Sequence, residues 1–300
     1  MNYDYLLVIA IIGMGSIAKK SGLVKNKDGE GLARIVFNFT LPAVVIDAFS
    51  TIVIDISLIY LSLIALLLGV VSGALGLLLF RKEDYRTKGM LLMPLLGVNI
   101  GLFAYPLVEA IWGKDIIKYF GVFDMGNSVV IFILCYIVGA VFSSKTGNID
   151  YRNILKKVSR SIPLIVYILT MLLRLVHWNY PSFILKVAAV IAQANMPLSL
   201  LVLGIFLSFS FDKKTLGKIF RVIGLKYAVG AVFGIILFLA LPYEPYYRYT
   251  VLVGVLLPTS LSIIPYAVEF DYDAKFIGAV SNISILISLV LMWVFSVFLK

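Results

Sequence analysis

An apolar stretch from Pro94 to Glu109 constrains the fold most strongly, because it is long enough to cross a membrane yet contains residues that interrupt a helix. Pro94 and Pro106 each lack a backbone N–H and clash with the preceding turn, and Asn99 lies between them. The interruption leaves carbonyl groups near Gly101 without helical partners, which hydrocarbon tolerates only where protein or water satisfies them. The stretch therefore predicts a broken transmembrane helix whose break faces a polar cavity.

A second interrupted stretch lies in the other half of the chain, from Leu257 to Glu269, and contains Pro258 and Pro265. Both stretches pass from small or polar residues into a proline and end in Val-Glu. Paired interrupted spans in corresponding halves of a chain are typical of the binding sites of secondary transporters. The alternative is that the prolines only kink packed helices, but their occurrence as a matched pair favours a transport site.

The composition is that of an integral membrane protein. The 300 residues are 61% hydrophobic and 14% charged, with a mean hydropathy of +1.03, whereas soluble domains carry about a quarter charged residues. The net charge of +10 comes from short basic clusters between apolar segments, a pattern that favours a positive cytoplasmic face over nucleic-acid binding. One cysteine and one histidine argue against disulfides, a metal centre or histidine-based catalysis. We expect an all-α protein in the lipid bilayer, with no cofactor, no bound metal and no nucleic-acid partner.

Ten apolar segments are each long enough, at about 1.5 Å per residue, to cross about 30 Å of hydrocarbon. They cover residues 3–20, 31–50, 55–80, 89–112, 117–142, 162–179, 183–210, 219–241, 247–269 and 275–299. The first has no positive n-region and no cleavage site, so we expect no cleavable signal peptide.

The basic residues predict the orientation of these spans. Of the 26 lysines and arginines, those on the side of the N-terminus are Lys114, Lys118, Arg174, Lys186, Arg248 and Lys300, and the rest fall on the opposite side. This bias places both termini outside the cytoplasm. Lys226 is grouped with the cytoplasmic cluster after span seven, so we expect no lysine or arginine near the midplane.

A polar linker at residues 143–161 divides the chain into halves at 1–142 and 162–300, with five spans in each. Because five is odd, a duplicated second half would enter the membrane in the opposite direction. Pro42 in span two and Pro197 in span seven are offset by 155 residues, which supports a duplication. We therefore predict an all-α integral membrane fold with ten transmembrane helices as a 5+5 inverted repeat, in which the broken helices four and nine cross.

The two breaks predict a site for an anion. Pro106 and Pro265 suit the first turn of a second half-helix, whose partly positive N-terminus would point at the membrane centre and favour a carboxylate. The opposing half-helix ends would supply free carbonyls suited to a cation or a substrate hydroxyl.

Polar side chains around the breaks are candidate ligands of the substrate. Asn99 stands among apolar neighbours, where it either contacts substrate or forms an interhelical hydrogen bond. Other candidates are the hydroxyls of Thr259, Ser260 and Ser262, which alternatively bond to their own helix, and the amides of Gln193 and Asn195 before Pro197.

Asp124 and Asn127 lie about one turn apart and share a face of span five. An acid inside a span is a functional candidate, here as a proton carrier or part of a cation site, with a surface ion pair to Lys118 as the alternative. Glu109 and Glu269 follow the breaks and are interpreted as solvated acids at helix ends.

Four segments carry a resemblance to a known family. They are Gly97–Pro106, Phe123–Asn127, Ala194–Gly204 and Pro258–Pro265, and they resemble the auxin efflux carrier family, which includes plant auxin exporters and bacterial permeases for malate and malonate and belongs with the bile-acid/sodium symporter superfamily. The resemblance implies a scaffold domain (spans one, two, six and seven), a transport domain (spans three to five and eight to ten), elevator-type movement and a homodimer. It also implies that Asn99 and Asn127 are the polar positions of spans four and five.

These patterns predict a secondary transporter of small organic anions in the cell membrane, and the resemblance implies substrates such as auxin-like monocarboxylates or malate and malonate. The sequence has no nucleotide-binding loop of the Gly-x-x-x-x-Gly-Lys type, so a substrate, proton or sodium gradient must drive transport. The alternatives are a membrane-embedded sensor with a transporter fold and a sodium-coupled organic-anion symporter. We do not expect an enzyme, because no serine–histidine pair or cluster of intramembrane acids is present.

Overall fold

The computed structural model describes residues 3–50, 52, 55–143, 151–208 and 215–299, and the regular secondary structure of these residues is helical. The first half contains α1 (Tyr3–Lys20), α2 (Asn26–Ile35), η1 (Val36–Thr40), α3 (Leu41–Phe49), α4 (Ile56–Leu79), α5 (Tyr85–Leu96), η2 (Ile100–Ala104), α6 (Tyr105–Trp112), η3 (Lys114–Ile116), α7 (Ile117–Val129), η4 (Val130–Cys135) and α8 (Tyr136–Val141). The rest of the chain contains α9 (Tyr151–Val158), α10 (Ile162–Leu175), α11 (Ser182–Ala192), α12 (Asn195–Phe206), α13 (Leu216–Ala240), α14 (Pro245–Gly254), η5 (Leu261–Ile263), α15 (Ile264–Glu269) and α16 (Ala274–Phe298).

Six helices in the described residues are long and apolar enough to cross a membrane, and the count rises to seven if α9 and α10, which meet at a bend of 66°, form one span. The six are Asn26–Phe49, Ser57–Leu79, Lys114–Val141, Ser182–Phe206, Leu216–Ala240 and Ala274–Phe298. Large apolar side chains on their outer faces are exposed, including Val232, Ile236 and Leu239 of α13. These features support the prediction of a multi-pass helical membrane protein.

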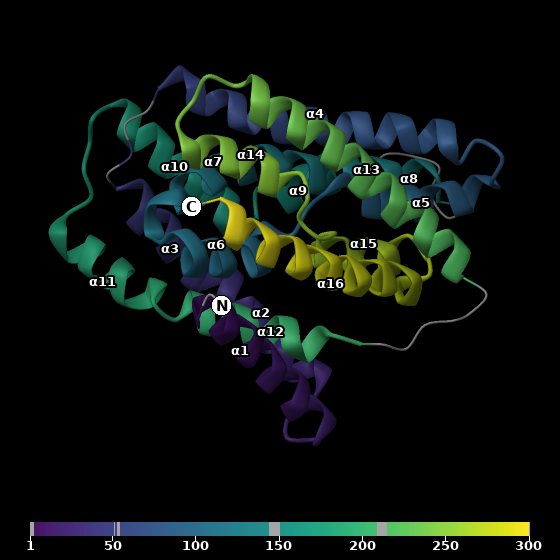
Figure 1. The fold of residues 1–300 in the computed structure, drawn as a ribbon, viewed down its shortest axis with the longest axis horizontal. Coiled ribbons are helices and arrows are strands. Elements are labelled where there is room, and N and C mark those ends of the chain that lie inside the picture. The colour runs from purple at the N-terminus through teal and green to yellow at the C-terminus, as the bar shows by residue number, and fades with distance from the viewer. Residues whose placement is uncertain (1–2, 51, 53–54, 144–150, 209–214, 300) are drawn as a thin grey trace.

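The helices lie side by side in an elongated bundle (Figure 1). In this view α4 and α13 follow one edge, α1, α2 and α12 follow the opposite edge, and α15 and α16 lie between them. The buried apolar side chains form two clusters: the larger includes Phe49, Phe103 and Phe123, and the smaller includes Tyr136 and Phe276.

Local sequence determines where several helices begin and end. Asp84 starts α5, because its Oδ1 accepts a hydrogen bond from the backbone N–H of Thr87 at 2.9 Å. Hydrogen bonds from Thr87 also lower the pKa of the Asp84 carboxyl. Asp273 caps α16 in the same way, and α5 ends at Leu96 because Gly97 is extended (φ −95°, ψ 159°).

Two glycines allow α1 and α12 to pack backbone against backbone. A Cβ atom at Gly15 would lie 2.4 Å from the carbonyl oxygen of Leu201, and one at Gly204 would lie 2.1 Å from that of Ile12. Such close helix approach is common in membranes, where packing replaces the hydrophobic effect between helices. By contrast, a Cβ at Gly13 of the same helix would meet nothing within 4 Å.

We therefore predict opposite outcomes for two alanine substitutions in α1. Gly15→Ala must push α1 away from the α12 backbone and should lower the free energy of unfolding by about 1–3 kcal/mol. Gly13→Ala should leave stability equal or slightly higher, because alanine favours a helix over glycine. Thermal unfolding of the purified variants in detergent measures both, and equal melting temperatures would contradict the proposed α1–α12 contact.

Candidate functional site

The two interrupted stretches meet at their breaks. The first break is the non-helical segment 97–99 between α5 and η2, and the second is the segment 255–260 between α14 and η5. Val98 pairs with Thr259 as an antiparallel bridge, the N–H of Asn99 donates to the carbonyl of Pro258 at 2.9 Å, and the N–H of Ser260 donates to the carbonyl of Gly97 at 3.4 Å. Each break thus satisfies backbone groups that the other break leaves without helical partners.

The second half-helices begin earlier than the sequence interpretation placed them. Helical structure resumes at Ile100 and Leu261 rather than near Pro106 and Pro265, which lie in the first turns of α6 and α15. The reason is side-chain capping. Asn99 Oδ1 accepts from the N–H of Leu102 at 3.3 Å, and Ser260 Oγ accepts from the N–H of Ser262 at 3.3 Å. Asn99 and Ser260 therefore stand at the two helix N-termini.

Asn127 of α7 supports the first break directly. Its Oδ1 accepts from the N–H of Val98 at 2.9 Å and its Nδ2 donates to the carbonyl of Val98 at 3.0 Å. The same Nδ2 donates to Asp124 Oδ1 at 2.9 Å, so the amide of Asn127 joins the break to the acid that the sequence singled out.

Asp124 is buried and bonded to neutral donors. Besides Asn127, its Oδ2 accepts from the hydroxyl of Tyr167 in α10 at 3.0 Å, and this hydroxyl also contacts that of Tyr105 in α6. Within the described residues Asp124 forms no ion pair, and Lys118 instead lies over the ring of Tyr119. The carboxyl is therefore an interior group of the site.

Thr259 supports the second break. Its Oγ1 donates to the carbonyl of Pro94 at 2.9 Å, and its N–H donates to Ser284 Oγ at 3.0 Å. The side chain is fully buried, so it links α5 to α16 through the bridge.

Lys226 was missed by the sequence analysis, and the expectation of no basic residue deep in the membrane is wrong. Its side chain is 5% exposed, and its Nζ donates to the carbonyl of Gly97 at 3.4 Å. Ten residues separate it from Leu216, the first residue of α13, which at about 1.5 Å per residue places it about 15 Å along the helix. The distance of Lys226 from the start of its apolar span could have identified it as buried, but the sequence analysis grouped it with the basic residues that precede that span.

A cavity of about 520 Å³ reaches the first break. Five of the predicted residues line it: Asn99, Asp124, Asn127, Ser260 and Ser262. Apolar parts of its wall come from Phe37, Leu41, Ile131, Phe132 and Tyr266. The lining combines a few polar groups with aromatic and aliphatic surface, as small-molecule sites do.

The other predicted residues lie elsewhere. Pro106 and Thr259 are buried outside the cavity lining, and Pro265 and Gln193 are exposed. Asn195 is buried in α12, where its Oδ1 accepts from the hydroxyl of Thr40 at 2.9 Å.

The amide of Asn99 carries an unpaired hydrogen-bond donor. Among the polar side chains at the first break, within the residues that the structure describes, it is the one donor without a partner. The Asn99 side chain is 4% exposed, and its Nδ2 has no partner. The residue also lines the cavity and caps the helix 100–112, so an unpaired donor and a helix N-terminus lie beside the same space.

Helix α9 and the turn that follows it form the basic border of the cavity. Lys156, Lys157 and Arg160 all line it, and the apolar residue Ile154 anchors α9 in the smaller core cluster. The cavity thus extends from an amide at the break to basic side chains in the segment predicted as the linker.

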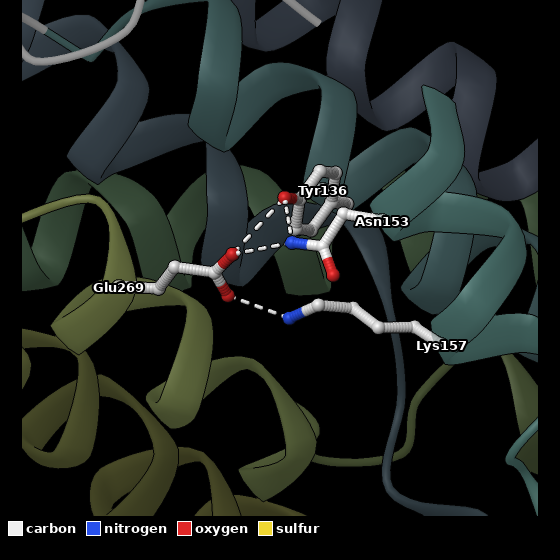
Figure 2. Close-up of polar contacts among 4 residues, drawn as sticks. All are labelled: Tyr136, Asn153, Lys157 and Glu269. Atoms are coloured by element: carbon white, nitrogen blue, oxygen red, sulfur yellow. Dashed lines mark hydrogen bonds and ion pairs between the residues drawn. The ribbon is translucent and has the colours of Figure 1, made fainter. Parts of the chain in front are cut away.

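A polar cluster holds α9 against the end of α15 (Figure 2). Glu269 Oε2 lies 2.5 Å from Lys157 Nζ, and Oε1 accepts from the hydroxyl of Tyr136 and from Asn153 Nδ2, both at 3.0 Å. Glu269 is therefore an exposed acid at a helix end, as the sequence suggested, and it also forms an ion pair.

No three histidine, cysteine, aspartate or glutamate residues gather into a metal-binding group in the described ranges. Side chains bond to three carbonyl groups at or near the first break. The Thr259 hydroxyl donates to Pro94, the Lys226 ammonium group donates to Gly97, and the Asn127 amide donates to Val98. The expectation that these carbonyls are free for a cation is therefore not met.

We predict that Asn127→Leu loosens the first break. The change removes three hydrogen bonds and leaves both polar groups of Val98 unpaired in an apolar setting, which should lower the free energy of unfolding by about 2–4 kcal/mol. Hydrogen exchange followed by mass spectrometry should accelerate in the segment 97–100. The exposed amide of Asn26 provides the control Asn26→Leu, and equal exchange in the two variants would refute the role of Asn127.

We also predict an energetic coupling between Lys157 and Glu269. Because both side chains are partly exposed, a double-mutant cycle of Lys157→Met and Glu269→Gln should give about 0.5–1 kcal/mol from denaturant titrations in detergent. The same cycle with Lys156→Met should give none, since Lys156 has no ion pair in the described structure. Equal coupling in both cycles would mean that the pair does not hold α9.

Comparison with known proteins agrees with this architecture. A family model described as membrane transport protein matches residues 4–296. An uncharacterized transporter from Methanocaldococcus jannaschii is 28% identical over 213 residues, which cover 68% of each chain, and one from Methanothermobacter thermautotrophicus is 23% identical over 302 residues, covering 98% of this chain and 97% of the relative. The match confirms the resemblance inferred from the interrupted stretches: the chain belongs to the membrane transport protein family, which is similar to auxin efflux carriers.

Proposed function

We propose that this protein is a secondary transporter that carries small organic anions across the cell membrane by alternating access. The observation that carries the proposal is the free Nδ2 donor of Asn99, buried at a helix N-terminus and bordering a cavity. A buried donor without a protein partner is unfavourable unless a ligand satisfies it. A carboxylate fits, because it accepts from the amide and is stabilised by the helix dipole.

The proposal includes ten spans in two inverted halves. Besides the six long helices, α1, α10 and the two interrupted pairs α5–α6 and α14–α15 would each cross the membrane. Two contacts support the repeat. First, the breaks of the fourth and ninth spans pair with each other. Second, Thr40 bonds to Asn195, and these residues lie two positions before the offset prolines Pro42 and Pro197, respectively. Equivalent elements of two copies meet in this way near a two-fold axis.

An elevator movement would change the side on which the cavity opens. In this scheme α1–α3 and α10–α12 form a static scaffold, and α4–α8 and α13–α16 form the moving transport domain. The cavity supports the division because Phe37 and Leu41 line it from the scaffold, while Asn99 and Ser260 line it from the transport domain. The same scheme has α9 in the cytoplasmic linker, both termini outside and a homodimer through the scaffold.

Candidate substrates are auxin-like monocarboxylates and the dicarboxylates malate and malonate. Asp124 and Asn127 are the groups through which a proton would couple to transport, since Asn127 links the acid to the break. The predicted binding groups Pro106, Thr259, Pro265, Gln193 and Asn195 would act indirectly, by shaping the helices around the site.

The test is uptake of labelled malate, malonate and indole-3-acetate into proteoliposomes, with and without imposed proton or sodium gradients. Wild type should show saturable flux, and Asn99→Ala should reduce it at least tenfold, since a donor to a charged group contributes about 1.5–3 kcal/mol. Asn26→Ala, which removes an exposed amide outside the cavity, should transport normally.

Each other outcome of this experiment has a defined meaning. Binding without flux under every gradient would favour a sensor, and flux that requires sodium would favour a sodium-coupled symporter. Normal transport by Asn99→Ala would remove the site from the first break, and the absence of both binding and flux would overturn the proposal.

A further inference from the structure

Lys226 is a buried basic residue that forms no ion pair with any residue the structure describes. Its side chain is 5% exposed and lies in α13 among the buried residues Val222, Ile223 and Val229. Its one hydrogen bond is the 3.4 Å contact of Nζ with the carbonyl oxygen of Gly97, and no acid of the described chain lies within ion-pair distance. Burying an ammonium group is costly unless an opposite charge compensates it, so this position requires an explanation beyond packing.

The side chain lies directly behind the wall of the cavity. The carbonyl of Gly97 that Lys226 contacts also accepts from the N–H of Ser260. Ser260 and Val98, the residue after Gly97, both line the cavity. Asn99 is two residues from Gly97, a span of at most about 7 Å of extended chain.

Asp124, the acid joined to the first break by hydrogen bonds, does not directly neutralise the charge of Lys226. Asp124 reaches the break only through Asn127, and its second oxygen is bonded to Tyr167. An anion bound at Asn99 would instead share the segment 97–99 with Lys226, so a short stretch of backbone would separate the two charges. In a protein interior, opposite charges that are separated in this way attract each other strongly enough to affect affinity.

We infer that Lys226 is a buried positive charge beside this site and that it strengthens the preference of the site for anions. The inference rests on the proposed function. The carboxylate of the transported molecule, bound at Asn99, neutralises the ammonium group across the segment 97–99. Lys226 also orients that segment through the carbonyl of Gly97, so it is a positioning residue that acts on the ligand through its charge and through the backbone.

The experiment is equilibrium binding of labelled malate, malonate and indole-3-acetate to purified protein in detergent. Lys226→Ala should weaken binding of the transported anion about tenfold. Ethylammonium, which can occupy the space left by the side chain, should restore affinity as its concentration rises, whereas uncharged propanol should not. Lys226→Arg should retain most of the affinity, and Lys218→Ala, on the exposed part of the same helix, should bind like wild type with or without amine.

Rescue by amine separates charge from packing, because a merely structural role would respond to propanol as well. If Lys226→Ala fails to fold, Lys226→Met replaces it for the affinity measurement, and Lys226→Arg then carries the comparison of charge. The inference would be overturned if Lys226→Ala or Lys226→Met bound the anion with wild-type affinity, or if amine did not reverse the loss of affinity in Lys226→Ala. The proposed function would remain intact in either case if Asn99→Ala still abolished binding. A wild-type protein that binds none of the three anions would overturn both.

Discussion

The two broken helices depend on one requirement: backbone groups buried in an apolar interior must be hydrogen-bonded by the protein itself. Neither break achieves this alone. Gly97 and Asn99 find partners in Ser260 and Pro258, so stretches about 160 residues apart must pack against each other before either is stable. This mutual dependence brings residues 97–99, between α5 and η2, together with residues 258–260, between α14 and η5.

Side chains complete what the backbone pairing leaves unfinished, and this explains why the polar residues gather at the first break. Asn127, Thr259 and Lys226 together bond four backbone groups of Pro94, Gly97 and Val98. Asn99 uses its oxygen to cap the following helix and has its Nδ2 left over. This unpaired donor is therefore what remains after the break has been stabilised, and it is the group that we propose to bind the ligand.

Much of this arrangement could be predicted from the sequence, because prolines, glycines and lone polar residues in apolar spans have strong local consequences. The two breaks and the grouping of Asn99, Asp124, Asn127 and Ser260 depend on such local signals. The helix begins at Ile100 because Asn99 caps it with a hydrogen bond. From the sequence alone, a start near Pro106 is equally reasonable. Contacts such as Tyr167 with Asp124 and Lys226 with Gly97 join distant elements, and no pattern along the chain specifies them.

The distribution of bonds also bears on how the proposed movement could occur. The bonds that hold the breaks together lie within α5–α8 and α13–α16, so they would move as a unit in the proposed elevator. Other bonds cross the boundary between the proposed scaffold and the proposed transport domain, such as that of Tyr167 to Asp124 and that of Tyr5 to the carbonyl of Leu289. A sliding domain can exchange one such bond, whereas separating the paired breaks would expose several backbone groups to hydrocarbon at once. The backbone bonds between the two breaks are thus internal to the proposed moving part, whereas separate side-chain bonds cross its boundary, one of them to a carboxyl that is joined to the site.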